Sequence, residues 1–413
     1  MIPPRFRTRL QSCFVISGLM LAQEIATTCA ADELVVPPAE GMLQVTVPVT
    51  SQSLSSGRLV EDPGAAEPIA FDLVPGWGRD GLPSATARRL VASIPSKSGA
   101  QGPRRFRALE AVKAVSGPGS DFRYEPVSGQ SLGLWEGRKP VFVYNHGVLT
   151  RPGVPEDRYR STYVHPIYGI DGEVLTDDFP KDHYHHRGLF WAWPHVKVAE
   201  SNYDLWDLRG IEQRFERWLD RRCGSAAAIL GVENGWYVGG RKVAHERVWL
   251  TVFPAGSTGR VIDVDLTWVP TSQSITLLGA EEKSYGGFTL RYAPRTGTII
   301  TTPRGSSPED LAVTRLPWAD LSARFEGAPR ESGAAVFISP DHPDYPPTWL
   351  TRHYGVLCVG WPGVKAATFQ PGEEIRCSYR VWIHRDRPGV DELTGMNRLY
   401  QSGRQAHWAA ADQ

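Results

Sequence analysis

The sequence predicts an all-β protein, and three observations lead to that prediction. The 413-residue chain holds 41 Gly, 33 Pro and 14 Trp, a composition typical of loop-rich β proteins rather than helical ones. From Leu43 onward, short runs of β-branched and aromatic residues recur between Gly and Pro, as strands do. Only residues 211–222, IEQRFERWLDRR, form a convincing helical window. We therefore expect little helix and many short strands arranged as a sandwich or barrel.

The first thirty residues have the pattern of a signal peptide. Arg5, Arg7 and Arg9 precede a short apolar run, and the small residues around Ala30 and Ala31 offer a cleavage site. The apolar run is too short to span a bilayer, and no later stretch reaches spanning length. We expect an exported chain that is soluble in the periplasm or outside the cell, without stable membrane insertion.

Two β domains are expected after this leader. Residues 31–120 predict a small N-terminal β-sandwich domain that ends at the turn-rich sequence SGPGSD. Residues 121–400 predict a large antiparallel β-sandwich, which carries every functional motif described below. Within it, Gly239 and Gly240 lie between two strand-like runs and predict a hairpin turn.

Charge and cysteine content narrow the classes of function. Lys plus Arg and Asp plus Glu both number 45, so the chain lacks the net positive charge that attracts nucleic acid. Beyond the leader, Cys223, Cys358 and Cys377 lack the spacing of a metal site. Cys358 and Cys377 lie in strand-like runs, where they either pair across neighbouring strands or remain buried free thiols. We expect no nucleic-acid partner and no fold built on disulfides.

The stretch DHYHHRGLFWAW, residues 182–193, carries the strongest functional signal. If it is extended, His183, His185 and Arg187 share one face. Two histidines at i and i+2 can converge on a metal ion, or they can present a base and an acid to a substrate. The alternative is a polar strand end whose histidines satisfy backbone groups. Three histidines with an acid and an arginine are costly to bury without a function, which favours a site.

Further candidates lie in neighbouring segments. His165 follows a strand-like run and leads through several acids to Asp182. The pair Gly286–Gly287 opens a strand that carries Arg291, and paired glycines allow either a ligand or another strand to come close. Arg291 is expected to bind substrate or, alternatively, to pair with an acid. Trp349 follows a Pro-rich loop and is either a wall of the site or part of the core.

Several motifs resemble those of exported bacterial proteins catalogued as the PmoA family or as domains of unknown function. These are residues 163–193, the run SYGGFTLRY, the segment around residues 342–355 and the closing PGEEIRCSYRVWIH. The resemblance covers residues 130–390 and implies an exported β-sandwich of unassigned chemistry in bacteria that degrade polysaccharides. The family name refers to a methane oxygenase subunit, a membrane enzyme with several spanning helices, and no stretch here is long enough for one.

The large domain also resembles the galactose-mutarotase-like proteins. Two features carry the resemblance: histidines at the rim of the domain and a late strand with the sequence Pro-Gly-Glu. That resemblance implies an antiparallel β-supersandwich for residues 121–400. It also implies a histidine acid and a glutamate base. In this sequence no single glutamate stands out as the base, and the candidates for that role are Asp182, Glu281 and Glu282.

These observations together indicate a carbohydrate-active enzyme that works at or near the anomeric carbon, as an epimerase, hydrolase or lyase. His183 and His185 are expected to supply acid–base chemistry, with Asp182 fixing the tautomer of a histidine. The residues expected to bind the sugar through polar groups or flat rings are Arg187, Arg291, Trp191, Trp193, His165, His186 and Trp349. Two alternatives remain: a glycan-binding module without catalysis, and the copper oxygenase that the family name suggests.

The remaining question about cofactors is whether the protein binds one divalent metal ion. His183 and His185, with His165 or Asp182 as a third ligand, have the residue types to hold it. Arg187 on the same face opposes this, because its fixed positive charge repels a cation. We therefore favour acid–base chemistry without a metal.

Overall fold

The protein is almost entirely β, as predicted. The structure is a computed structural model that describes residues 33–49, 57–62, 67–97, 99, 102–110 and 121–409. The described strands pair antiparallel in four sheets, and no described helix is long and apolar enough to cross a membrane. The predicted leader, residues 1–30, and the predicted domain boundary at residue 120 lie outside the described residues.

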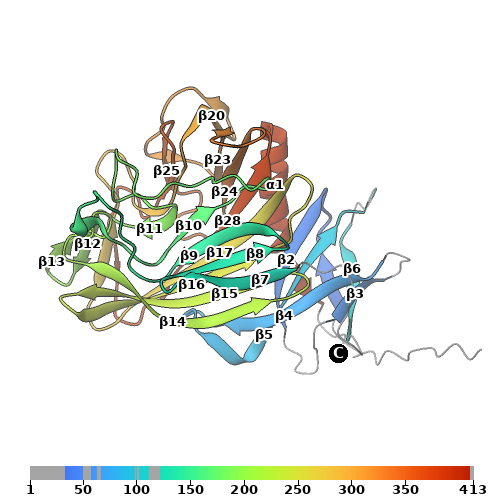
Figure 1. Ribbon diagram of the computed structural model, residues 1–413. Helices are drawn as coiled ribbons and strands as arrows, with labels where there is room; N and C mark the ends of the chain where they lie inside the picture. The colour runs from blue at the N-terminus through green and yellow to red at the C-terminus, as the bar shows by residue number, and fades with distance from the viewer. Residues whose placement is uncertain are drawn as a thin grey trace, which may run out of the picture.

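Two nine-stranded sheets form the body of the molecule (Figure 1). Sheet 1 has the order β22-β25-β26-β19-β11-β10-β9-β8-β7. Its strands are β7 (Phe122–Ser128), β8 (Ser131–Glu136), β9 (Lys139–Asn145), β10 (Tyr163–Ile167), β11 (Leu189–Ala192), β19 (Gly287–Arg291), β22 (Thr314–Arg315), β25 (Thr348–Arg352) and β26 (Val356–Gly360).

Sheet 2 has the order β14-β15-β16-β17-β28-β24-β23-β20-β21. Its strands are β14 (Glu212–Cys223), β15 (Ala228–Val238), β16 (Arg241–Val252), β17 (Gly259–Pro270), β20 (Arg295–Thr302), β21 (Gly305–Ser307), β23 (Trp318–Phe325), β24 (Ser332–Ile338) and β28 (Ile375–Arg385). A four-stranded sheet 3 consists of β12 (His195–Val198), β13 (Ser201–Tyr203), β18 (Ile275–Leu278) and β27 (Ala367–Phe369).

The main hydrophobic core lies between sheets 1 and 2. Phe142 and Leu357 from sheet 1 belong to the same buried cluster as Leu230 and Val264 from sheet 2. Side chains alternate between the two faces of a strand. Leu230 therefore points into this core while its neighbour Ile229 packs in a second cluster on the opposite face of sheet 2. Burial on both faces explains why β15 is buried without interruption from Ala228 to Trp236.

The N-terminal strands form a seven-stranded sheet 4 in the order β2-β5-β4-β3-β6-β1-β29. Its strands are β1 (Glu33–Val36), β2 (Met42–Val49), β3 (Gly57–Glu61), β4 (Ile69–Trp77), β5 (Pro83–Pro95), β6 (Arg104–Glu110) and β29 (His407–Trp408). The chain's last described strand, β29, pairs with β1, so the sheet is completed by residues from the far end of the sequence.

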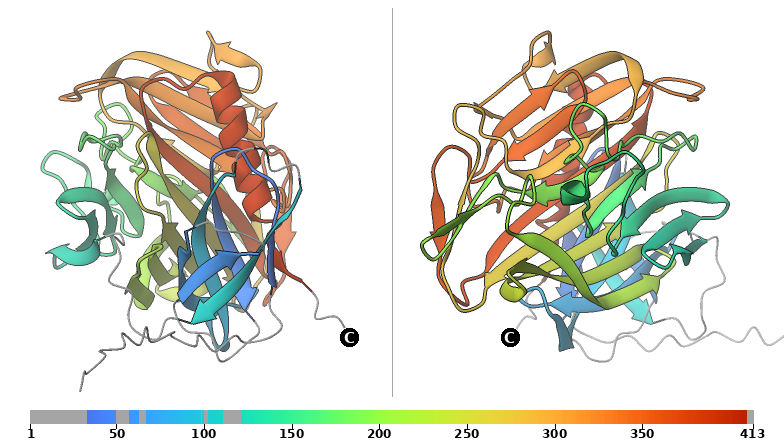
Figure 2. Two further views of the ribbon diagram at one scale, coloured as in Figure 1. Left: turned by 90° about the vertical axis from the view of Figure 1, so that its right-hand side faces the viewer. Right: turned by 60° about the vertical axis from the view of Figure 1, so that its left-hand side comes forward.

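Sheet 4 packs against the outer face of sheet 2 (Figure 2). Trp77 of β4 stacks on Trp249 of β16, with ring centroids 4.4 Å apart. Helix α1 (Val390–Gly403) lies at this junction: Leu399 packs with sheet 4, while Leu393 packs with sheet 2. The short 3-10 helix η1 (Glu156–Arg158) lies in the connection between β9 and β10.

The helical window predicted at residues 211–222 is wrong. This segment is β14, an edge strand that pairs along its length with β15. The pairing register shifts between Phe215 and Arg217 and again between Trp218 and Asp220. Such bulges interrupt the two-residue alternation of a strand, so the apolar side chains fall at spacings that resemble a helix.

Two smaller predictions concern a turn and the cysteines. Gly239 and Gly240 connect β15 to β16 with φ of 53° and 81°, which confirms the predicted hairpin turn. Cys358 and Cys377 are buried free thiols on β26 and β28, which belong to different sheets. They therefore do not pair across neighbouring strands.

Candidate functional site

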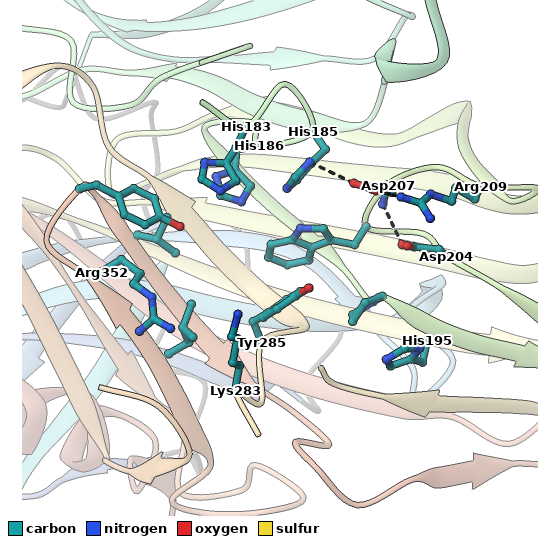
Figure 3. Close-up of a pocket in the computed structure, with 15 residues that line it drawn as sticks. His183, His185, His186, His195, Asp204, Asp207, Arg209, Lys283, Tyr285 and Arg352 are labelled. Carbon is teal, nitrogen blue, oxygen red and sulfur yellow. Dashed lines mark hydrogen bonds and ion pairs between the residues drawn. The ribbon is translucent and has the colours of Figure 1, made fainter. Parts of the chain in front are cut away.

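A polar cavity of about 380 Å³ opens beside sheet 1. Five segments surround it: the loop before β11, the link from β11 to the start of β12, the loop between β13 and β14, the turn before β19, and strands β25 and β26 with their connection. The lining residues are His183, His185, His186, Pro194, His195, Asp204, Trp206, Asp207, Arg209, Lys283, Tyr285, Leu350, Arg352, Tyr354 and Val356 (Figure 3).

The histidine segment before β11 is a pair of turns, not the extended strand that the sequence predicted. The backbone N–H of His183 donates to the carbonyl of Pro180, and that of His186 donates to the carbonyl of His183. Strand β11 begins only at Leu189. Gly188 lies against β10, where a Cβ atom would approach the Val164 carbonyl oxygen to 2.4 Å. The turns bring all three histidines to the cavity instead of dividing them between two faces.

The three imidazoles form part of an aromatic cluster. His183 lies between two nearly parallel rings, those of His186 at 4.7 Å and Tyr354 at 5.3 Å between centroids. His185 meets His183 and His186 edge-on, at 5.6 and 4.6 Å. Trp206 packs its ring edge-on against His186 at 5.6 Å. Contacts on several sides hold the imidazoles in fixed orientations.

Two of the histidines are each paired with a carboxylate. His183 Nδ1 lies 3.0 Å from Asp182 Oδ2, and His185 Nδ1 lies 3.0 Å from Asp207 Oδ1. Both contacts are ion-pair contacts: His183 Nδ1 makes no hydrogen bond within the described residues, and each carboxylate acts on its imidazole through charge. The predicted contact between Asp182 and a histidine is therefore present. Asp207 is a second carboxylate that the sequence reasoning missed.

Burial makes His185 and His186 weak bases. It lowers the pKa of His185 to about 4, although the charge of Asp207 acts in the opposite direction. Burial, followed by the neighbouring charge of His185, holds the pKa of His186 well below its usual range. Burial raises the pKa of Asp182, but its contacts with His183 and Arg291 outweigh this, so the net shift is downward. At neutral pH, His185 and His186 are therefore neutral while Asp182 is ionised.

Asp207 is held by a tight turn between β13 and β14. The backbone N–H of Asp207 donates to Asp204 Oδ1 at 2.8 Å, and Leu208 adopts a φ of 61°. The N–H groups of residues 205 and 206 both donate to the Trp193 carbonyl, which fixes the turn to the end of β11. Arg209 donates to Asp207 at 2.5 Å. The sequence signal was the closely spaced acids and arginine in YDLWDLRG, which nothing local connects to His185.

Arg187 does not face the cavity, so the prediction that it binds a substrate oxygen is wrong. Its side chain is fully buried, and its guanidinium donates to the carbonyls of Tyr184, His186 and Arg158. Its Cζ lies 3.7 Å from the ring centroid of Phe179. Arg187 therefore holds the histidine turns in place from behind.

Arg291 takes the alternative role considered from the sequence, that of pairing with an acid. Its Nη2 lies 2.8 and 2.9 Å from the two oxygens of Asp182. Its guanidinium lies 4.9 Å from the centroid of Tyr354. Arg291 thus orients Asp182, which in turn orients His183. The paired glycines before it admit another strand, because a Cβ at Gly287 would lie 2.6 Å from the Val359 carbonyl of β26.

The predicted stacking wall of tryptophans is also wrong. Trp191, Trp193 and Trp349 have no exposed surface and belong to the main core. The indole N–H of Trp193 donates to the Trp361 carbonyl at 2.5 Å, and that of Trp349 donates to the Leu316 carbonyl at 2.8 Å. The aromatic rings that do line the cavity are Trp206, Tyr285 and Tyr354, with Tyr354 43% exposed.

Replacing Trp191 with alanine is expected to reduce stability rather than binding alone. Emptying a fully buried indole site costs about 3–5 kcal/mol, because the surrounding β strands cannot collapse into the space. Urea denaturation measures this loss in the free energy of unfolding. Tyr354→Ala serves as the comparison, since the loss of its exposed ring should cost much less stability. A Trp191→Ala protein of unchanged stability would contradict the buried position.

Of the predicted metal ligands, His165 lies apart from His183 and His185. His165 lines a separate cavity of about 560 Å³, and its Nδ1 lies 3.1 Å from Thr176 Oγ1. Burial lowers the pKa of His165 to about 3. A three-ligand set of His183, His185 and His165 therefore does not form around one point.

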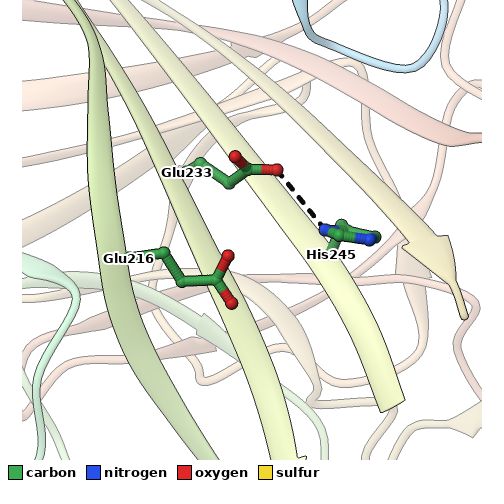
Figure 4. A group of neighbouring side chains, drawn as sticks. All are labelled: Glu216, Glu233 and His245. Atoms are coloured by element: carbon green, nitrogen blue, oxygen red, sulfur yellow. Dashed lines mark ion pairs between the residues drawn. The ribbon is translucent and has the colours of Figure 1, made fainter. Parts of the chain in front are cut away.

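Within the described part of the chain, one group of three residues has metal-ligand geometry: Glu216, Glu233 and His245 (Figure 4). Its carboxylates already have cationic partners. Glu233 pairs with Arg217 at 2.6 Å and Arg247 at 2.9 Å. Glu216 pairs with Lys242 at 2.5 Å. Three cations balance the two acids, so a metal ion would meet net repulsion.

Comparison with known families places this site in a larger group of proteins. Residues 134–396, more than half of the chain, match a family of unknown function (DUF6807). The chain belongs to DUF6807. Every residue that lines the histidine cavity falls within the matched part of this DUF6807 protein, whereas β1 to β6 precede it. No curated protein matches the chain. The DUF6807 description names neither an oxygenase nor a mutarotase.

Proposed function

We propose that this chain is an exported enzyme that acts on a carbohydrate, at or near the anomeric carbon, by histidine–carboxylate acid–base chemistry. One observation carries the proposal: two histidines of one cavity each turn Nδ1 toward a carboxylate 3.0 Å away. Both imidazoles remain accessible, with 37% of the His183 side chain and 21% of the His185 side chain exposed. Each pair is thus an oriented proton donor or acceptor at the cavity wall.

His185 is the general base in this proposal. Its pKa of about 4 leaves it neutral at physiological pH, so Nε2 can accept a proton from a substrate or from water. The carboxylate of Asp207, 3.0 Å from Nδ1 of the same ring, would stabilise the positive charge that the imidazole then gains. His183, 5.6 Å away between centroids, acts in its protonated form and gives its Nε2 proton to the oxygen on which negative charge develops. Two such groups at this separation can serve one sugar residue.

The remaining lining residues suit a sugar. Trp206, Tyr285 and Tyr354 offer ring surface for the apolar face of a pyranose, while Asp204 and His195 offer polar groups for its hydroxyls. A cavity of about 380 Å³ is of the size that small ligands occupy. These features equally support binding without catalysis, and the variants of His185 described below separate an enzyme from a glycan-binding module.

The pH dependence of turnover is expected to reflect His185. A general base works only when deprotonated, so kcat/KM should rise with pH on its acidic limb through an apparent pKa of about 4. Asp207→Asn removes the charge that raises the pKa of His185, so the acidic limb should move to still lower pH as overall activity falls. A kcat/KM profile measured between pH 3 and 8 tests both statements. An acidic limb near the usual histidine value would contradict the assignment.

A further inference from the structure

We propose that the sugar carries a carboxylate, as in a uronic acid glycoside, and that Lys283 and Arg352 bind this group. The inference rests on the proposed function and specifies its substrate class. Figure 3 shows Lys283 and Arg352 on the side of the cavity away from Asp204 and Asp207. The cavity thus has an acidic side, which holds His185, and a basic side, which holds Lys283 and Arg352.

The charges of the lining residues leave Lys283 uncompensated. Arg209 pairs with Asp207, and Arg352 approaches Asp310 at 3.8 Å. Within the described residues, the Lys283 ammonium has neither an ion pair nor a hydrogen bond. A lysine without a partner in a concave polar site favours an anionic ligand, because the ligand's charge replaces the missing carboxylate.

Arg352 is pre-oriented for the same group. Its Nη1 donates to the carbonyls of Leu311 at 3.0 Å and Thr351 at 2.9 Å. These bonds fix the guanidinium plane, while Nη2 has no hydrogen-bond partner among the described residues. A guanidinium that is held through Nη1 and free at Nη2 can donate hydrogen bonds to a carboxylate.

The backbone around Lys283 is strained in a way that favours a binding role. Glu282 and Ser284, which flank it, adopt φ of 58° and 60°, a left-handed conformation that costs non-glycine residues energy. The N–H groups of Lys283 and Ser284 both donate to the Ala280 carbonyl, at 3.3 and 2.8 Å, and close the turn. The turn places Lys283 and Tyr285 together in the lining.

Calorimetric binding to the full chain tests the substrate class. The probes are methyl glucuronoside and methyl galacturonoside, each compared with its methyl ester, a neutral compound of nearly the same shape. We expect the acids to bind about 10- to 100-fold more tightly than the esters. Lys283→Gln should abolish this preference and Lys283→Arg should retain most of it. Lys365→Gln, an exposed lysine outside the cavity, should leave the preference unchanged.

Three outcomes would overturn the inference: esters that bind as tightly as the acids, a preference that survives in Lys283→Gln, or binding of methyl galactoside 6-sulfate but of neither acid. The last would assign the basic side to a sulfate instead. Binding is also measured in His185→Ala, which lacks the proposed base but keeps Lys283. If the native protein shows no turnover but His185→Ala still binds the acids more tightly than the esters, the proposed function fails and this inference stands.

Discussion

Replacing His185 with alanine is expected to lower kcat by about 10²- to 10⁴-fold on any substrate that the native protein turns over. The reason is that His185 is the proposed base, and the other histidine of the cavity with a carboxylate at Nδ1, His183, has the role of the acid. Sugar affinity should change little, because Trp206, Tyr285 and Tyr354 remain. A screen of turnover on acidic and neutral glycosides, with KM and kcat measured separately, checks the prediction.

His245→Ala is the matched control. His245 also pairs with a carboxylate, with Nδ1 3.4 Å from Glu233 Oε1, but it lies on β16 outside the cavity. Its loss should leave kcat unchanged. If His183→Ala and His185→Ala both retain full turnover, the acid–base proposal fails. If the native protein binds sugars without turnover and Tyr354→Ala abolishes that binding, the chain is a glycan-binding module.

Replacing Glu246 with leucine is expected to destabilise the fold by on the order of 4 kcal/mol. Glu246 of β16 is fully buried. The side chains that donate hydrogen bonds to its carboxylate, at 2.8 to 3.0 Å, are those of Gln213, Asn234, Trp236 and Trp268. Leucine has no acceptor, so four buried N–H groups would lose a partner at once.

The Glu246 network also connects the two large sheets. Gln213 donates to the Trp191 carbonyl of β11 at 3.2 Å, and Asn234 bonds to the Tyr144 hydroxyl of β9 at 3.0 Å. Urea denaturation measures the loss, and Glu212→Leu, an exposed glutamate on β14, should change stability by no more than about 0.5 kcal/mol. Equal effects of the two substitutions would show that the network does not support the sandwich.

The all-β fold of this protein can be recognised from local sequence. Gly and Pro between short β-branched runs identify an all-β chain, because strand propensity and turn chemistry are local properties. The concentration of three histidines, an acid and an arginine in residues 182–187 is also local, which is why the sequence alone marks this segment as a candidate site. The contact of Asp182 with His183 is also local, at one residue's separation.

Tertiary structure alone decided which distant groups meet. Asp207 reaches His185 from the loop after β13, and Tyr354 reaches His183 from the connection of β25 to β26. Those encounters depend on strand pairing and sheet packing, which no short segment encodes. The same packing placed Trp191 in the core, because a strand's pattern shows that its residues alternate between faces but not which face is covered by another sheet. It also turned residues 212–223 into an edge strand, since pairing with β15 outweighed their helical spacing.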